Sequence, residues 1–467
     1  MKKQTIVFRS DIKAPANVVF DWHKYPGAFE RYNPPWDPVE LVASTGTIKP
    51  GATKVLRLWM GPMPRKWVAE HRDYEEGRMF QDVQVSGPFA HWEHTHIIEP
   101  TDDKSCILED RIEYALPMGP VGHWFGNSFM RNKLETVFAY RHRTLQLDIA
   151  AHLQRREQKA MKILITGGTG LVGGDLSAFL SSGGHEVYNL TRNQKEDEHS
   201  IHWNPDEAKI AEDKLNGFDA VVHLAGESIV GRWSAAKKER ILNSRVNGTK
   251  LLCEALARQE QPPKVIVSAS AIGYYGNRAD ETMTEESTPG DLFLSDVCKQ
   301  WEEATKPAAD KGIRVVNARI GIVLSPKGGA LAQMLFPFRM GGGGVIGSGK
   351  QWMSWITLDD VVAGLHHMIE TEELRGPVNL VAPNPVTNTE FTKTLGKVLW
   401  RPTIFPMPGF AARLVFGQMA DELLLASTRV EPTKLQQAGY EFRHSNLEEA
   451  LRYLLGKEKK TPEAANV

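Results

Sequence analysis

The chain has few cysteines, no long apolar run and no excess of charge of either sign. Its three cysteines, Cys106, Cys253 and Cys298, lie far apart and form no CxxC pair. This spacing excludes a disulfide framework and a cysteine-based zinc site, and it is typical of a protein in a reducing compartment.

The missing apolar run excludes a membrane-spanning helix, which needs about 20 apolar residues. No apolar stretch follows the charged start Met1 to Gln4, so we expect no secretion signal and a cytoplasmic location. Because 56 Lys and Arg nearly cancel 57 Asp and Glu, leaving a net charge of −1, the composition indicates no nucleic-acid partner.

The rest of the composition is that of a globular protein, with 41% hydrophobic and 24% charged residues. A length of 467 residues exceeds one ordinary core and predicts about two to four domains. The sequence leaves the oligomeric state open.

Residues 4–115 mix β-branched and aromatic residues with polar ones in short runs, which predicts a curved antiparallel sheet. The expected strands are 5–12, 39–43, 53–59, 67–74, 78–85, 90–98 and 106–114. A short helix is expected over 15–22, and a long one over 121–152 that packs on the sheet. Its expected apolar stripe is Phe125, Phe129, Leu134, Val137, Phe138, Leu145 and Ile149.

This order of elements, with the segment APANVVFDW and an NPPW loop, resembles the START-like superfamily of polyketide cyclase and Bet v 1-like proteins over residues 1–155. The resemblance implies an α+β helix-grip fold with an apolar cavity between sheet and helix, and therefore a hydrophobic ligand. An ordinary filled core with a docking surface is the alternative.

His94 and His96 share one face of an expected strand, as two metal ligands would. A tight site needs a third and a fourth ligand, and the sequence nominates neither. We therefore expect these histidines to be structural or solvated, and we expect no metal site.

A second domain begins at Met161, after the charged segment 154–160. An expected strand, 162–165, leads into TGGTGLVG (166–173), a helix over 175–182 and a strand over 186–190. Gly167, Gly170 and Gly173 suit the tight turn, the close approach to a pyrophosphate and the close helix packing of a dinucleotide site. The pyrophosphate would lie at the N-terminus of the helix.

The end of the second strand distinguishes the two nicotinamide dinucleotides. An acidic residue there binds the 2′-hydroxyl of NAD(H), whereas an arginine accommodates the 2′-phosphate of NADP(H). Arg192 makes NADP(H) the expected cofactor, although a surface arginine without this role would leave the preference open. The candidate cofactor-binding residues are Thr166, Gly167, Gly170, Leu171, Val172, Gly173, Thr191, Arg192, Leu224, Ala225, Gly226 and Ser268.

Further strands over 220–224, 265–268 and 315–319 alternate with helices over 237–259 and 297–310. This order predicts a doubly wound parallel α/β sheet of the Rossmann type.

Five motifs in order resemble the extended short-chain dehydrogenases, and more narrowly the YfcH-like or SulA-like epimerase homologues. They are TGGTGLVG, HLAGE (223–227), SASAIGYYG (268–276), ARIGIVLS (318–325) and IGSGKQWMSWITLDDVV (346–362). The resemblance covers residues 161–456 and ends in a small helical region of the DUF1731 type. The expected domains are therefore 1–155, 161–400 and 401–456, with a disordered tail over 457–467.

The active-site residues depart from this family. Its members use a serine and a Tyr-x-x-x-Lys pair, in which the lysine lowers the pKa of the tyrosine so that the phenol moves a proton during hydride transfer. Ser270 matches the serine, but no tyrosine stands in place. Alignment on Lys299 puts Ser295 at the tyrosine position. Alignment on the following Trp-Glu pair puts Leu294 there and Cys298 at the lysine position.

Ser270, Lys299 and Tyr274 are the candidate catalytic residues. Lys299 would bind the nicotinamide ribose, unless it is a solvated helix residue. Tyr274 or Tyr275 would replace the missing proton donor, unless both are packing residues.

Two functions agree with these residues. The first is an NADP(H)-dependent oxidoreductase or epimerase-like enzyme with a small-molecule substrate, fused to a domain that binds a hydrophobic ligand. The alternative is a sensor, related to cell division or the envelope, that holds NADPH with little or no turnover.

Overall fold

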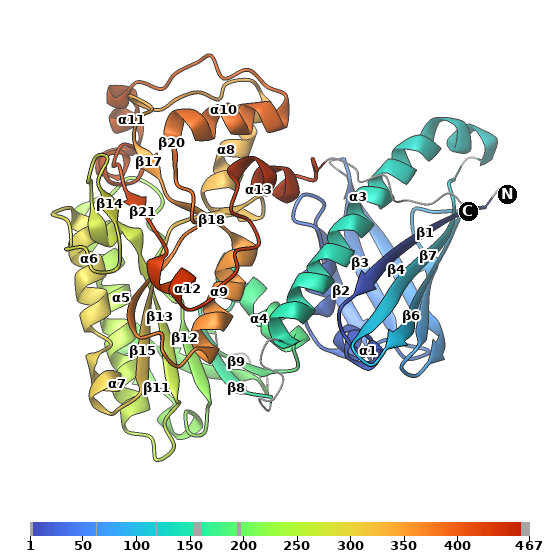
Figure 1. Cartoon of the computed structure of the whole chain (residues 1–467), viewed down its shortest axis with the longest axis horizontal. Coiled ribbons are helices and arrows are strands. Elements are labelled where there is room, and N and C mark those ends of the chain that lie inside the picture. The colour runs from blue at the N-terminus through green and yellow to red at the C-terminus, as the bar shows by residue number, and fades with distance from the viewer. Residues whose placement is uncertain (1–2, 62, 118, 154–159, 194–197, 459–467) are drawn as a thin grey trace. The chain divides into compact units, whose positions relative to one another are not determined.

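The computed structural model describes residues 3–61, 63–117, 119–153, 160–193 and 198–458. Its contacts divide the chain into two compact units (Figure 1). Unit 1 is Met1–Lys159 with Ser181–Gly184 and Tyr453–Val467, and unit 2 is Ala160–Leu180 with His185–Arg452. The segment 154–159 at the expected boundary, and 459–467 of the expected tail, lie outside the described residues.

Unit 1 is built on a seven-stranded antiparallel sheet with the order β1-β7-β6-β5-β4-β3-β2. The strands are β1 (Gln4–Ile12), β2 (Val39–Thr45), β3 (Thr53–Met60), β4 (Met63–Glu75), β5 (Met79–Ser86), β6 (His91–Asp102) and β7 (Ser105–Ala115). In β6 the alternation of side chains places Trp92, His94, His96 and Ile98 on the buried face. The expected sheet is confirmed, because this alternation is readable in the sequence.

The helices of unit 1 are α1 (Ala16–Lys24), α2 (Ala28–Tyr32) and α3 (Gly119–Leu153). The members of the expected stripe on α3 that are fully buried are Leu134, Phe138, Leu145 and Ile149. Phe129 was wrongly included, since its side chain is 69% exposed. Met130 takes its place against the core, because it lies four residues before Leu134 and so on the same helix face. The side chain of Phe125 lies outside the described residues.

The interior of unit 1 is not uniformly apolar. One apolar cluster contains Trp92, Ile112 and Phe138, and a second contains Ile98, Leu108 and Leu145. Each of three elements passes from one cluster to the other through buried polar residues. These residues are His94 and His96 on β6, Asp110 on β7, and His142 on α3. A polar layer therefore separates the two clusters.

Unit 2 is built on an eight-stranded sheet with the order β11-β10-β9-β8-β12-β13-β15-β19. Its strands are β8 (Lys162–Thr166), β9 (Glu186–Thr191), β10 (Ser200–Asn204), β11 (Lys209–Ile210), β12 (Ala220–His223), β13 (Val265–Ala271), β15 (Arg314–Ile320) and β19 (Gly376–Leu380). All pairs are parallel except β10 with β11. The chain runs outward from β8 in one direction and from β12 in the other. Ligands of such sheets bind at this switch point, at the carboxyl ends of the strands.

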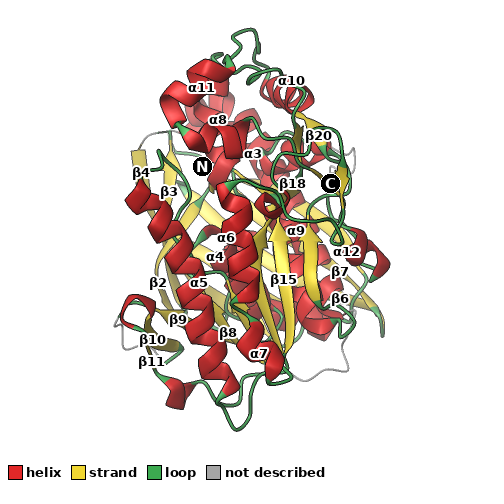
Figure 2. Cartoon of the chain, turned by 90° about the vertical axis from the view of Figure 1, so that its left-hand side faces the viewer, coloured by secondary structure: helices red, strands yellow, loops and turns green. Residues whose placement is uncertain are grey.

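Helices cover both faces of the parallel sheet, as the expected doubly wound fold requires. Figure 2 shows α5 (Ala235–Ala257), α6 (Phe293–Glu303) and α7 (Lys306–Asp310) over one face. Figure 1 shows α4 (Leu171–Ser182) and α9 (Leu358–Glu370) on the other.

One expected helix was wrong in its bounds. The segment 297–310 was expected to be continuous, but it breaks between α6 and α7. Pro307 has no N–H to donate, so it is best accommodated in the first turn of a helix, which is its place in α7.

Short elements and the C-terminal region complete unit 2. They are η1 (Pro205–Glu207), η2 (Glu212–Lys214), η3 (Ile272–Tyr275), β14 (Thr282–Met283), β16 (Ile322–Ser325), α8 (Gly329–Arg339), β17 (Trp352–Met353), β18 (Trp355–Thr357), β20 (Val386–Thr387), α10 (Asn388–Leu399), α11 (Gly409–Phe416), η4 (Ala420–Leu424), β21 (Arg429–Val430), α12 (Thr433–Gln437) and α13 (Leu447–Leu454), whose residues from Tyr453 on are assigned to unit 1. β21 pairs with β14 in a separate two-stranded sheet, so the C-terminal region is joined to the segment that follows β13. No helix in the described ranges is both long and apolar enough to cross a membrane.

Candidate functional site

The backbone of the loop between β8 and α4 packs so closely against neighbouring atoms that only glycine fits at several of its positions. Gly167 has φ of +72°, in the left-handed region that favours glycine. A Cβ on Gly173 would lie 2.2 Å from the carbonyl oxygen of Gly167. Thr169 and Gly170 are exposed where α4 begins, and the N-terminus of a helix favours a bound anion.

A buried acceptor lies beside this loop. A Cβ on Gly168 would be 1.9 Å from Oδ1 of Asn189 on β9. Among the described residues this oxygen has no hydrogen-bond partner. A close backbone cradle next to an unsatisfied acceptor fits a bound polar ligand such as a dinucleotide.

Thr166 links the ends of β8 and β12. Its hydroxyl oxygen accepts hydrogen bonds from the backbone N–H groups of Leu224 and Ala225, each at 3.0 Å. The hydroxyl hydrogen is then left to donate to His223 Nδ1, 2.7 Å away, and His223 Nε2 lies 2.9 Å from the hydroxyl of Thr249. Burial lowers the pKa of His223 to about 4. The neutral ring therefore holds the two strand ends at the switch point together.

The expected cofactor residues lie mainly at this carboxyl edge. Arg192, directly after β9, is exposed and forms no ion pair with the described part of the chain. Leu224 and Ala225 are half-buried and Gly226 is exposed, just after β12. Ser268 is fully buried inside β13, with its hydroxyl 3.4 Å from the carbonyl oxygen of Ala269.

Ser270 belongs to a buried network around a carboxylate. Its hydroxyl donates to Glu302 at 2.7 Å. Arg319 binds both oxygens of the same carboxylate, each at 2.8 Å. Arg319 is 2% exposed and the Glu302 side chain is 13% exposed, so this is a largely buried, bidentate pair. The sequence reasoning missed Glu302, whose only signal was its place beside Trp301 in the family alignment.

Both candidate tyrosines contact Arg319. The guanidinium carbon lies 3.5 Å from the centre of the Tyr274 ring. The Tyr275 hydroxyl donates to Asn379 at 2.6 Å and accepts from Arg319 at 3.0 Å. Burial raises the pKa of Tyr275 to about 12. Tyr275 is therefore fixed in the core, whereas Tyr274 is half-buried above the Ser270 network.

Helix α6 carries the positions where the family's tyrosine and lysine are expected. Ser295 donates to the carbonyl oxygen of Gly273 at 2.9 Å, and burial raises the pKa of the Cys298 thiol to about 11. Both lie on the buried face of the helix, whereas Lys299 is exposed. The structure brings Ser270 and Tyr274 together through Glu302 and Arg319, and it leaves Lys299 outside this network.

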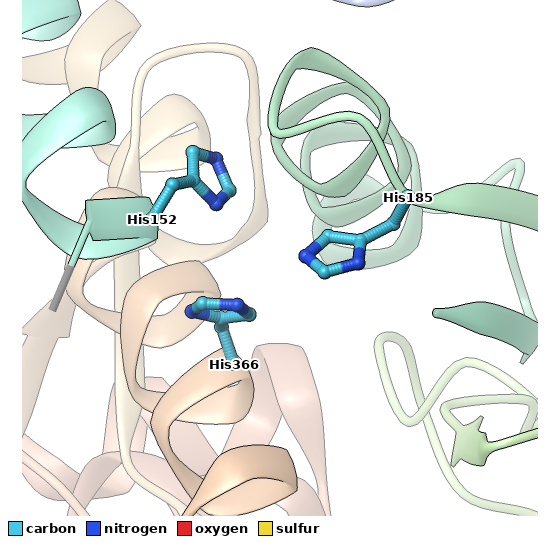
Figure 3. A group of neighbouring side chains, drawn as sticks. All are labelled: His152, His185 and His366. Atoms are coloured by element: carbon cyan, nitrogen blue, oxygen red, sulfur yellow. The ribbon is translucent and has the colours of Figure 1, made fainter. Parts of the chain in front are cut away.

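A histidine pair lies near the amino ends of the parallel strands, opposite to the glycine loop. His185 directly precedes β9, and its ring centre is 5.7 Å from that of His366 on α9 (Figure 3). Burial, with a smaller effect of His366, lowers the pKa of His185 to about 4. This pair is at the amino ends of the strands, away from the edge where such sheets bind ligands.

The polar layer of unit 1 brings carboxylates to the two histidines of β6. Asp110 lies 2.7 Å from His94 Nε2 and 2.6 Å from His96 Nδ1. Asp82 on β5 lies 3.3 Å from His94 Nδ1. The sequence reasoning found no further ligand beside the histidines because Asp82 and Asp110 come from neighbouring strands, in register with His94 and His96 respectively.

The charges of this layer shift its ionisations. Burial opposes the charged form of His94, but hydrogen bonds to Asp110 and Asp82 raise its pKa to about 9. Burial and the charge of His94 lower the pKa of His96 to about 4. The imidazoles around Asp110 hold the pKa of that carboxyl well below its usual range, despite its burial. Residues 3–153 therefore contain a second candidate site.

Three family models match the chain in succession. Residues 3–146 match polyketide cyclase/dehydrase and lipid transport proteins, residues 163–380 match the NAD dependent epimerase/dehydratase family, and residues 407–454 match a domain of unknown function, DUF1731. These matches agree with the three resemblances drawn from the sequence.

Proteins of known sequence or structure are similar to the same parts. An epimerase family protein of Mycobacterium bovis is 42% identical over 292 residues, 62% of this chain and 96% of that protein. A nucleoside-diphosphate sugar epimerase structure from Corynebacterium glutamicum is 34% identical and has a TM-score of 0.80, covering 98% of this chain and 91% of that chain. The human epimerase family protein SDR39U1, solved with NADPH, is 36% identical with a TM-score of 0.59, covering 63% of this chain and 99% of that chain. The chain therefore belongs to the epimerase family, with a polyketide cyclase-like domain before the epimerase domain and a DUF1731 region after it.

Proposed function

We propose that unit 2 binds NADP(H) at the carboxyl edge of its parallel sheet, across the switch point between β8 and β12. The observation that carries this proposal is the glycine cradle, in which a Cβ on Gly173 would meet the Gly167 carbonyl oxygen at 2.2 Å. The structure of the human relative, determined with NADPH, supports the choice of cofactor.

Each part of the cofactor has a proposed set of contacts. The loop from Gly167 to Gly173 and the N-terminus of α4 would hold the pyrophosphate. Thr191 and Arg192 would hold the 2′-phosphate, and the backbone of 224–226 would pass close to the adenosine side. When bound, the dinucleotide supplies or accepts a hydride.

The chain's own chemistry would centre on Ser270. We propose an oxidoreductase or epimerase-like reaction on a small molecule, in which Ser270 positions the reacting oxygen and Tyr274 exchanges the proton that accompanies the hydride. Glu302 and Arg319 hold Ser270 and Tyr274 in place. The proposed contact of Lys299 with the nicotinamide ribose gains no support from its exposed position.

Nucleotide titration of the full chain tests the cofactor site. We expect NADPH and NADP+ to bind more tightly than NADH and NAD+, followed by nucleotide fluorescence and thermal shift. Arg192→Ala should weaken NADPH binding by roughly 10- to 100-fold, because it removes a charge-assisted contact, and should leave NADH binding unchanged. Arg375→Ala is the matched control, since Arg375 is exposed just before β19 at the opposite edge. The assignment would be refuted if the original chain bound the four nucleotides with equal affinity, or if Arg192→Ala and Arg375→Ala bound NADPH equally tightly.

A second candidate function is an NADPH-holding sensor with little turnover, connected with cell division or the envelope. The observation that favours it is the buried Ser270 hydroxyl, which already donates to Glu302. NADPH oxidation with a panel of carbonyl compounds and sugar nucleotides separates the two functions. Turnover that falls by about 100-fold or more in Ser270→Ala supports the enzyme. Tight NADPH binding without turnover on any panel member supports the sensor.

A further inference from the structure

The polar layer of unit 1 places three potential metal ligands on one face of the sheet. His94 and His96 are two residues apart on β6, and Asp82 is directly opposite His94 on β5. An Asp82 oxygen lies 3.3 Å from His94 Nδ1 and 4.0 Å from His96 Nε2. One ligand atom from each residue lies within 4.8 Å of the others. Ligand atoms of a tetrahedral zinc site stand roughly 3.4 Å apart, given bonds of about 2.1 Å.

Asp110 holds the far side of both rings. It lies 2.7 Å from His94 Nε2 and 2.6 Å from His96 Nδ1, so the remaining nitrogen of each ring is the one directed to Asp82. His94 is hydrogen-bonded to Asp110 through Nε2, as the other ring nitrogen of a metal-binding histidine usually is to a carboxylate, which fixes the ring orientation. His96 Nδ1 is as close to Asp110, but without the geometry of a hydrogen bond.

Asp110 is itself held in place. Its second oxygen lies 2.6 Å from His142 Nε2 on α3, and His142 Nδ1 lies 2.8 Å from the hydroxyl of Ser10. The His96 ring stacks on Phe80 with centres 4.1 Å apart, and Phe138 meets the His94 ring edge-on at 5.2 Å. These contacts preorganise both imidazoles before any ion arrives.

The position is buried but not sealed. His94 and His96 are 4% and 7% exposed, whereas the side chain of Asp82 is 18% exposed. Asp82 is therefore the ligand nearest to solvent. His71 lies opposite Asp82 on β4, and its buried Nδ1 has no hydrogen-bond partner among the described residues.

We propose that unit 1 binds a divalent transition-metal ion of the zinc class through His94 Nδ1, His96 Nε2 and a carboxylate oxygen of Asp82. Two imidazoles and one carboxylate suit zinc or iron(II), whereas calcium and magnesium prefer oxygen ligands alone. Three protein ligands leave a position open for water, for His71 or for the oxygen of a bound ligand, as in catalytic sites.

The test uses the full chain without a polyhistidine tag, treated with EDTA and then freed of it. Co²⁺ is titrated with visible absorption as the readout and then displaced by Zn²⁺, and X-ray absorption of the zinc form reports the ligand atoms. We expect one ion per chain, with the intense visible bands of four- or five-coordinate Co²⁺ and with two imidazoles on zinc.

Four variants separate the site from surface binding. His96→Gln and Asp82→Asn each remove a ligand and should weaken Zn²⁺ binding by about 100-fold or more. Asp110→Asn should weaken it by about 10- to 100-fold while the Co²⁺ spectrum keeps its form, because Asp110 orients the ligands. His91→Gln is the control, since His91 is on the same strand but outside the buried face, and its affinity should equal that of the original chain.

A different result would overturn the proposal. Without a metal, a proton on His94 can join Asp82 to Asp110, and the layer is then a closed ion cluster. In that case Zn²⁺ binds the original chain no more tightly than it binds His96→Gln, and Co²⁺ gives only the weak spectrum of an octahedral surface ion. Circular dichroism identifies any variant that does not fold. Asp82→Asn decides the question if His96→Gln fails, because Asp82 is the most exposed of the three ligands.

Discussion

A single buried histidine connects the two strands at the centre of unit 2. His223 is 0% exposed and accepts a hydrogen bond from Thr166, whose oxygen already accepts two backbone N–H groups. A proton on Nδ1 of the ring would therefore face an oxygen with no further capacity to accept. Folding of unit 2 depends on this ring staying neutral.

The stability of unit 2 should consequently fall in mild acid. The folded pKa of His223 is about 4, below the ordinary value of 6.5, so between these values the unfolded chain binds a proton that the folded chain does not. The contribution of His223 is complete above pH 6.5 and is lost as the pH falls towards 4. The expected loss is about 3 kcal/mol, at about 1.4 kcal/mol per pH unit.

Urea unfolding at pH 7.5 and 4.5 measures this loss. His223→Gln is the comparison, because an amide can bond to Thr166 and Thr249 without titrating. The original chain should lose about 2 to 3 kcal/mol more than the variant between the two pH values. Equal losses would show that His223 does not control the acid response.

Residues differ in how far their roles can be read from the sequence. The glycines at 167, 170 and 173 were readable, because a tight turn and a close helix impose a local requirement on the chain. Glu302, Asp82 and Asp110 were not, because their partners lie on other elements. Glu302 is on α6 whereas the Arg319 that binds it is on β15, and only the sheet register places Asp82 beside His94.

At the scale of the element, helix α4 can approach β8 only because its first turn carries glycine. A Cβ on Gly173 would lie 2.2 Å from the Gly167 oxygen, whereas a Cβ on the next residue, Gly174, would meet its nearest neighbour at an ordinary 3.5 Å. Gly173→Ala should therefore push α4 away from the loop, abolish measurable NADPH binding and cost roughly 1–3 kcal/mol of stability.

Gly174→Ala is a matched control for that variant. It adds the same methyl group one residue along the helix, where alanine has the higher helix propensity, so binding and stability should be unchanged or slightly better. Thermal unfolding and NADPH titration of both variants supply the comparison. Equal behaviour of the two variants would mean that the packing of α4 does not form the site.

The elements themselves were predicted well where their periodicity was regular. The alternation is clearest in β6, where every second residue from Trp92 to Ile98 is buried. The sequence showed His94 and His96 on one strand face, but it showed the part of the polar layer on α3 only as a gap, since the apolar spacing passes from Phe138 to Leu145 across His142, which is buried. A polar residue at a core position of a helix is the signal that would have indicated a buried site.

At the scale of the whole molecule, unit 1 is completed by residues from the far end of the chain. Tyr453 is 1% exposed. Its ring stacks on Tyr140 with centres 5.3 Å apart, and Arg143 lies 4.8 Å from the ring centre. Tyr453→Ala should destabilise unit 1 by roughly 3–5 kcal/mol, because it removes a large buried side chain.

Hydrogen exchange with mass spectrometry locates this effect. Peptides from α3 and the sheet of unit 1 should exchange faster in Tyr453→Ala, and peptides from the parallel sheet of unit 2 should be unchanged. Phe129→Ala is the control, because Phe129 is on the same helix but 69% exposed, and its exchange should match the original chain. Faster exchange confined to unit 2 would contradict the assignment of Tyr453 to unit 1.

The return of the chain end to unit 1 has a consequence for synthesis. Tyr140 leaves the ribosome roughly 300 residues before Tyr453, which corresponds to about 15–60 s at about 5–20 residues per second. During this interval the surface of α3 around Tyr140 lacks its final covering, even though every strand of the first sheet has already been made. Unit 1, whose sheet is made before the epimerase domain, is therefore finished only after that domain, and chaperones have access to the α3 surface while the epimerase domain is being translated.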